Sequence, residues 1–103
     1  MRAVGMVVFL GLGLGCGASL PAPVPAESDV GRGVRFGEVT LESLEAGRAL
    51  FIERCSMCHE APAVTSNTPE EWEVEVSRMY ERAGLDEGQR GLVLRYLQTF
   101  AGD

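Results

Sequence analysis

The sequence contains no lysine, so all nine of its basic residues are arginines, and fifteen acidic residues outnumber them. The formal net charge of −6 argues against a nucleic acid partner, because neutralisation of phosphates supplies most of the affinity for nucleic acids. It favours a protein partner with a basic docking patch, which would be attracted by long-range electrostatic steering. Alternatively, the charge serves only to keep a small protein soluble.

The chain also lacks an apolar run of the roughly 20 residues that a membrane-spanning helix needs. Its apolar stretch, residues 3–14, is interrupted by glycines, follows Arg2 and precedes small residues around Cys16. This layout is typical of an export signal that is removed from the mature protein. We therefore predict that residues 1–16 are a signal and that the protein works in the periplasm.

Cys16 follows Gly15, and this pair resembles the processing site of bacterial lipoproteins, in which a small residue precedes the lipidated cysteine. Gly13 departs from that pattern, which usually has leucine there. The resemblance implies a lipid anchor at Cys16 that holds the protein at a membrane. The alternative is an ordinary signal cut near Ala18 or Ala22, which would release a soluble product.

Residues 17–40 are rich in proline, glycine and alanine. Such a composition buries little apolar surface, so we expect a flexible tether rather than part of the fold. The folded domain is then residues 41–103. A domain of that size usually needs a disulfide, a metal or a cofactor to stay folded.

No segment shows sustained alternation of apolar and polar residues, so we predict no sheet and an all-α fold with three helices. The first is expected from about residue 40 or 43 to residue 54. The second begins at the capping box of Thr68, with Pro69 at the first helical position, and runs to about Ala83 before Gly84. The third begins at the capping box of Asp86 and extends through residue 100.

Cys55, Cys58 and His59 form a Cys-x-x-Cys-His motif, which is the covalent attachment site of a c-type haem. Two thiols three residues apart can reach the two vinyl groups on one porphyrin edge, and the adjacent imidazole can then bind the iron. A thioredoxin-like redox pair would need neighbouring strands. A zinc site needs four ligands, and the mature chain has no further His or Cys to supply them. A disulfide between these cysteines would close almost no loop.

The stretch GRALFIERCSMCH, residues 47–59, resembles the first helix and haem site of class I c-type cytochromes. The resemblance covers about residues 45–100 and implies a small helical domain wrapped around one covalent haem c. It also implies that Gly47 and Phe51 pack against Tyr96 and Leu97 on the last helix. The chain departs from the family in the middle, where the segment between His59 and the last helix is short.

Met79 is the predicted sixth ligand of the iron. His59 is the only histidine, lysine is absent, and Met57 lies inside the attachment motif, where its tether is too short to reach the other face of the ring. Met79 shares one helical stripe with Trp72 and Val76. An open iron, a water or Tyr80 are the alternatives for this position. The side chains expected to pack around the haem are Phe51, Trp72, Val76 and Leu97.

With His and Met as axial ligands, the expected function is electron transfer by one haem c, with redox proteins as partners. The protein would then be a carrier rather than an enzyme, or the cytochrome subunit of a larger oxidoreductase. The alternative is a ligand-binding or sensor haem protein whose sixth position is open or labile. That chemistry usually needs distal acid–base groups, which the lack of a second histidine makes scarce.

Overall fold

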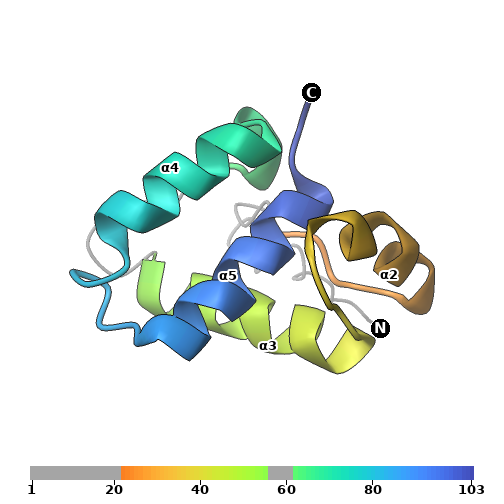
Figure 1. The fold of residues 1–103 in the computed structure, drawn as a ribbon, viewed down its shortest axis with the longest axis horizontal. Helices are drawn as coiled ribbons and strands as arrows, with labels where there is room; N and C mark the ends of the chain where they lie inside the picture. Colours follow the sequence, from red (N-terminus) through yellow and green to blue (C-terminus); the bar gives the residue numbers. More distant parts are fainter. Residues whose placement is uncertain (1–21, 56–61) are drawn as a thin grey trace, which may run out of the picture.

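The computed structural model describes residues 22–55 and 62–103, and within these residues every regular element is helical. The α-helices of these residues are α2 (Glu27–Gly33), α3 (Leu41–Leu50), α4 (Pro69–Met79) and α5 (Glu87–Phe100), and they are drawn in Figure 1. Short helical turns cover Val34–Phe36, Phe51–Cys55 and Val64–Ser66. The all-α prediction is confirmed for the described part of the chain. The three predicted helices correspond to α3, α4 and α5, while α2 was not predicted.

The predicted capping boxes begin α4 and α5. The Thr68 hydroxyl accepts a hydrogen bond from the Glu71 amide at 3.1 Å, and the Glu71 carboxylate accepts one from the Thr68 amide at 2.9 Å. Asp86 and Gln89 make the same reciprocal pair at 2.8 and 3.0 Å. These bonds satisfy amide groups that have no partner inside the helix, which is why both helices begin where the sequence indicates.

The end of α4 differs from the prediction, because the helix stops at Met79 rather than near Ala83. Turns follow as far as Gly84, whose φ of 75° lies in the left-handed region that glycine adopts without steric cost. The Leu85 amide then donates to the Tyr80 carbonyl at 2.9 Å. The chain reverses direction here, so α5 runs back along α4.

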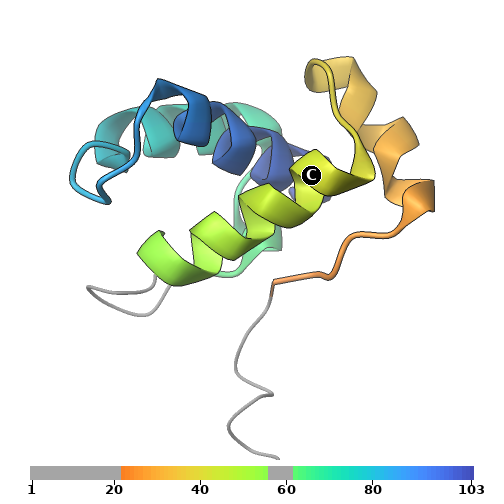
Figure 2. The same cartoon turned by 90° about the horizontal axis from the view of Figure 1, so that it is seen from below.

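Helix α5 lies at the centre of the fold, and α2, α3 and α4 all pack against it, as Figure 2 shows from a second direction. Helices α3 and α5 approach most closely at Gly47. A Cβ atom added there would meet the Leu92 carbonyl oxygen and would lie 2.8 Å from the Cβ of Tyr96. One turn later, the Phe51 and Tyr96 rings lie 6.1 Å apart. The packing expected of Gly47, Phe51 and Tyr96 is therefore present.

Gly47→Ala should destabilise the protein by at least about 2 kcal/mol, because the new methyl group forces the α3 and α5 backbones apart. That cost exceeds the roughly 1 kcal/mol that alanine gains over glycine in a helix. Gly91→Ala is the matched control, since nothing lies within 4 Å of the position of its Cβ. Thermal unfolding should show a lower Tm for the first variant and an equal or higher Tm for the second. Equal shifts in both variants would contradict the close contact.

The predicted tether over residues 17–40 is wrong for residues 22–40, which fold onto the domain; residues 17–21 lie outside the described part. Ala22 is buried, and its carbonyl accepts a hydrogen bond from Nε of Arg48 at 3.1 Å. The carbonyl of Pro23 accepts one from the Tyr96 hydroxyl at 2.7 Å. Burial raises the pKa of Tyr96 to about 12, so this hydroxyl stays a donor. We call residues 22–40 the N-terminal strap.

The strap folds because its small residues allow a close approach rather than because they bury large side chains. Gly33 is buried where α2 meets α5, and a Cβ there would lie 2.6 Å from the Thr99 hydroxyl. Val39, the one fully apolar strap residue at this contact, is buried beside it. Low hydrophobicity predicts disorder for an isolated segment, but here side chains of the helical domain bind the strap's backbone carbonyls.

Candidate functional site

A cavity of about 320 Å³ lies between the turn Phe51–Cys55, helix α4 and helix α5. Its volume is within the range of roughly 300–1,000 Å³ that is common for small-molecule sites. Its walls are mostly apolar. Every predicted site residue in the described part of the chain lines this cavity: Phe51, Cys55, Trp72, Val76, Met79 and Leu97.

Helix α4 supplies one wall of the cavity through its predicted apolar stripe. Trp72, Val76, Met79 and, beyond the helix end, Ala83 all line it. Trp72 is buried, and its indole Nε1 donates to the carbonyl of Val64 at 2.8 Å. Its ring meets the edge of Phe51 with 6.2 Å between ring centroids. The indole is therefore fixed by both a buried hydrogen bond and aromatic packing.

Met79 differs from the other members of this stripe, because it is 37% exposed although it lines the apolar cavity. It is also the last residue of α4. A thioether is a soft donor that suits iron in a haem. Met79 is therefore a residue of the cavity wall that could hold such an iron.

Cys55 ends the π-helical turn that continues α3. It is half-buried at the cavity wall, and burial raises the pKa of its thiol. The neighbouring Arg54 donates to the carbonyl of Gly84 at 2.8 Å and to that of Ala83 at 3.4 Å. Arg54 therefore joins the end of this turn to the chain reversal after α4, beside the cavity that it lines.

Three predicted site residues, Cys16, Cys58 and His59, lie outside the described residues. The structure therefore locates one of the two predicted haem thiols and one of the two predicted iron ligands. In sequence order, Cys55 and Pro62 are the cavity-lining residues that precede and follow residues 56–61. Motif positions 58 and 59 belong to that short stretch of sequence.

The sequence analysis missed the charged residues of the cavity. Arg54, Arg82 and Glu75 all line it. No sequence pattern identifies either arginine, because Arg54 lies in the turn that follows α3 and Arg82 lies beyond the end of α4, where helical spacing no longer applies. An apolar cavity with two cationic groups on its wall suits an apolar ligand that carries carboxylates.

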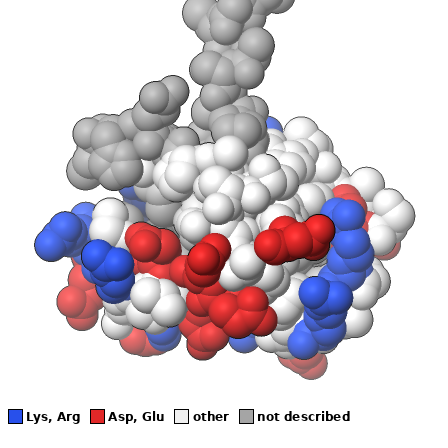
Figure 3. All heavy atoms as spheres, turned by 90° about the horizontal axis from the view of Figure 1, so that it is seen from above, with Lys and Arg blue, Asp and Glu red and all other residues white. Residues whose placement is uncertain are grey.

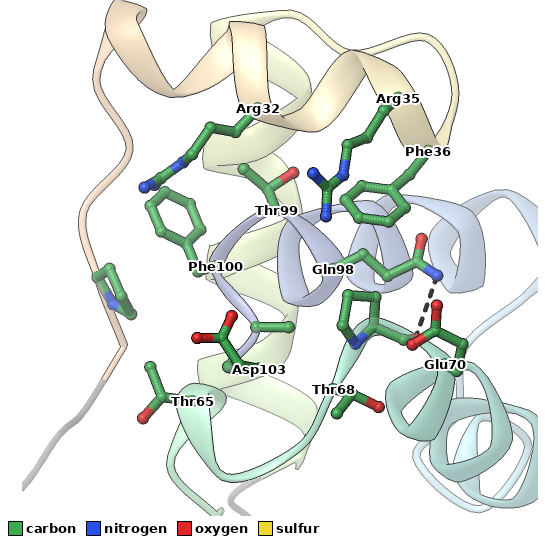
Figure 4. Close-up of a pocket in the computed structure, with 14 residues that line it drawn as sticks. Arg32, Arg35, Phe36, Thr65, Thr68, Glu70, Gln98, Thr99, Phe100 and Asp103 are labelled. Carbon is green, nitrogen blue, oxygen red and sulfur yellow. Dashed lines mark hydrogen bonds between the residues drawn. The ribbon is translucent and has the colours of Figure 1, made fainter.

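A second hollow, of about 660 Å³, lies between the N-terminal strap and the C-terminal end of α5 and is drawn in Figure 4. The Arg32 guanidinium lies over the Phe100 ring at 5.2 Å, and Arg35 lies over Phe36 at 4.8 Å. Glu70 and Asp103 also line it, so its charges are mixed. None of the predicted site residues lines this hollow.

Acidic side chains gather on one face of the molecule, with arginines at its edges, as Figure 3 shows. On α4, Glu70, Glu71 and Glu73 are all exposed. Nowhere in residues 22–55 and 62–103 is a helix long and apolar enough to cross a membrane. No family model matches this chain, and no curated protein or solved structure is significantly similar to it.

Proposed function

We propose that the protein is a carrier of single electrons outside the cytoplasm, with one haem c held covalently by Cys55 and Cys58 in the apolar cavity. The observation that supports this most is that all six predicted haem-contacting residues in the described part line one cavity. They come from the π-helical turn, α4 and α5, so sequence proximity does not explain why they meet.

The chemistry of the cavity wall fits a haem on three counts. The wall is mostly apolar and includes the large ring of Trp72, which suits a flat hydrophobic macrocycle. Cys55 lies on that wall, and its thiol would form one of the two thioethers. Arg54 and Arg82 supply cations with which the two haem carboxylates can pair.

When bound, the haem supplies an iron that accepts and releases one electron. His59 and Met79 would hold the iron, and a thioether ligand would favour the reduced form and raise the reduction potential. Trp72, Val76 and Leu97 would exclude water from the ring. With two side chains of the chain itself as ligands, the iron would have no free position for a substrate.

The acidic face supports a partner of opposite charge. Exposed carboxylates such as Glu70, Glu71 and Glu73 would steer a redox protein with a basic docking patch into a weak and short-lived complex. A lipid at Cys16 would keep the carrier at a membrane in the periplasm, where such partners are concentrated. The basic redox partner and the lipid anchor are two separate additions to the haem proposal, and neither depends on the other.

The experiment that tests the proposal is the optical spectrum of the full chain produced with a cytochrome c maturation system. The reduced protein should show the sharp bands of a low-spin c-type haem, and carbon monoxide should leave them unchanged. The oxidised protein should show a weak long-wavelength band from sulfur bound to iron. A high-spin spectrum that shifts with carbon monoxide would instead indicate the ligand-binding alternative, and lack of covalent haem would refute both.

A further inference from the structure

Met79 lies at the C-terminal end of α4, which is held by fewer contacts within the helix than the N-terminal half. The N-terminal half of α4 is fixed by the Thr68 cap and by the buried side chains of Trp72 and Val76. At the other end, the last carbonyl groups of a helix have no partners within it, and helix ends fray. A ligand on such an end needs other contacts to stay directed into the cavity.

The structure provides those contacts from α5, on both sides of Met79 in the sequence. The Tyr80 hydroxyl donates to a Glu87 carboxylate oxygen at 2.9 Å. The Arg90 guanidinium lies over the Tyr80 ring, 4.9 Å from its centroid, and donates through Nη2 to the Ser77 hydroxyl at 2.7 Å. Arg90 also pairs with Glu87 at 3.4 Å. Tyr80, Glu87 and Arg90 therefore form a closed ring of contacts, and Arg90 joins Ser77 to it.

These contacts surround the position of Met79. Ser77 and Tyr80 flank Met79 in the chain, and Tyr80 itself lines the cavity. Glu87 and Arg90 lie in the first turns of α5, which packs against α4. Any movement of Met79 away from the cavity that unwinds the end of α4 must break the bonds of Tyr80 or of Ser77.

We propose that Tyr80, Glu87, Arg90 and Ser77 are positioning residues that keep the Met79 sulfur directed into the cavity, and so make it a permanent ligand rather than a displaceable one. This inference rests on the proposed function. If these contacts were lost, Met79 would leave the iron for part of the time and the iron could then bind small ligands. The contacts therefore decide whether the protein acts as an electron carrier or as a ligand-binding haem protein.

Tyr80→Phe is the first test, since it removes the hydroxyl and keeps the ring over which Arg90 lies. In the haem-loaded protein, the apparent affinity of the reduced form for carbon monoxide should rise by about two- to tenfold, the range expected for losing one hydrogen bond. The long-wavelength sulfur–iron band should weaken in parallel. Ser77→Ala, which removes the acceptor used by Arg90, should change both readouts in the same direction.

Tyr96→Phe is the matched control, because it removes a hydroxyl that donates to the strap, at Pro23, and not to α5. It should lower the Tm without changing carbon monoxide affinity. The inference is overturned if Tyr80→Phe leaves the affinity unchanged, or if Tyr96→Phe raises it equally. Carbon monoxide binding by the wild-type protein at full occupancy would instead refute the ligation of Met79, and with it the proposed carrier function.

Discussion

The Met79→Ala variant should retain its covalent haem but, when reduced, bind carbon monoxide completely at concentrations at which the wild-type protein stays almost entirely unbound. Its reduction potential should fall by more than about 59 mV, which is a tenfold change in a one-electron equilibrium. The thioether stabilises reduced iron, and alanine leaves the position to water or to nothing. Optical titration under carbon monoxide and a redox titration measure the two effects.

Met57→Ala is the control for this variant, since Met57 lies inside the attachment motif and is not expected to reach the opposite face of the haem. It should keep the wild-type spectrum and should bind carbon monoxide no more than the wild-type protein does. If Met79→Ala also kept the wild-type spectrum and potential, the sulfur ligand would have to be assigned elsewhere. Tyr80, which lines the same cavity, would then be the next side chain to replace.

The parts of the fold that could be predicted are those with local chemical signals. Thr68 and Asp86 cap their helices with side chains that lie three residues from their partners, so the capping boxes could be identified from the sequence. The stripe of Trp72, Val76 and Met79 follows from helical spacing alone. These signals need no knowledge of the rest of the molecule, and α4 and α5 begin at the predicted positions.

The N-terminal strap could not be predicted, because what holds it lies 26 and 73 residues further along the chain. Arg48 binds the carbonyl of Ala22, and Tyr96 binds that of Pro23. Backbone carbonyls carry no sequence signal, since every residue has one. Composition describes how much apolar surface a segment can bury by itself. It therefore underestimates the tendency of a segment to fold when the domain binds that segment through its main chain.

The cavity was predictable in its apolar part and not in its charged part. Helical spacing places Met79 and Val76 on one face, but it does not show that the chain reversal after α4 brings Arg82 to the cavity wall. Arg54 reaches this wall because the π-helical turn continues α3 and its guanidinium binds the carbonyl of Gly84. Arg54 and Arg82 both lie just after the end of an α-helix, where the helical spacing of apolar residues no longer predicts which way a side chain faces.

Replacement of individual cysteines should separate the haem site from the membrane anchor. Cys55→Ala should greatly reduce covalent haem, because Cys55 is the thiol that lies on the cavity wall. Haem staining after denaturing electrophoresis measures this loss, and Cys58→Ala should behave in the same way. The unpaired vinyl group then leaves the haem held by one thioether at most, and replacing both cysteines should abolish attachment.

Cys16→Ala is the matched substitution for these variants, since it removes the same thiol at a position that precedes the folded domain. It should retain full haem staining and move the protein from the membrane fraction to the soluble periplasmic fraction. Unchanged membrane association would refute the lipid anchor and leave the haem site untouched. Unchanged haem staining in the double variant of Cys55 and Cys58 would refute covalent attachment itself, because no other cysteine remains in the mature domain to form a thioether.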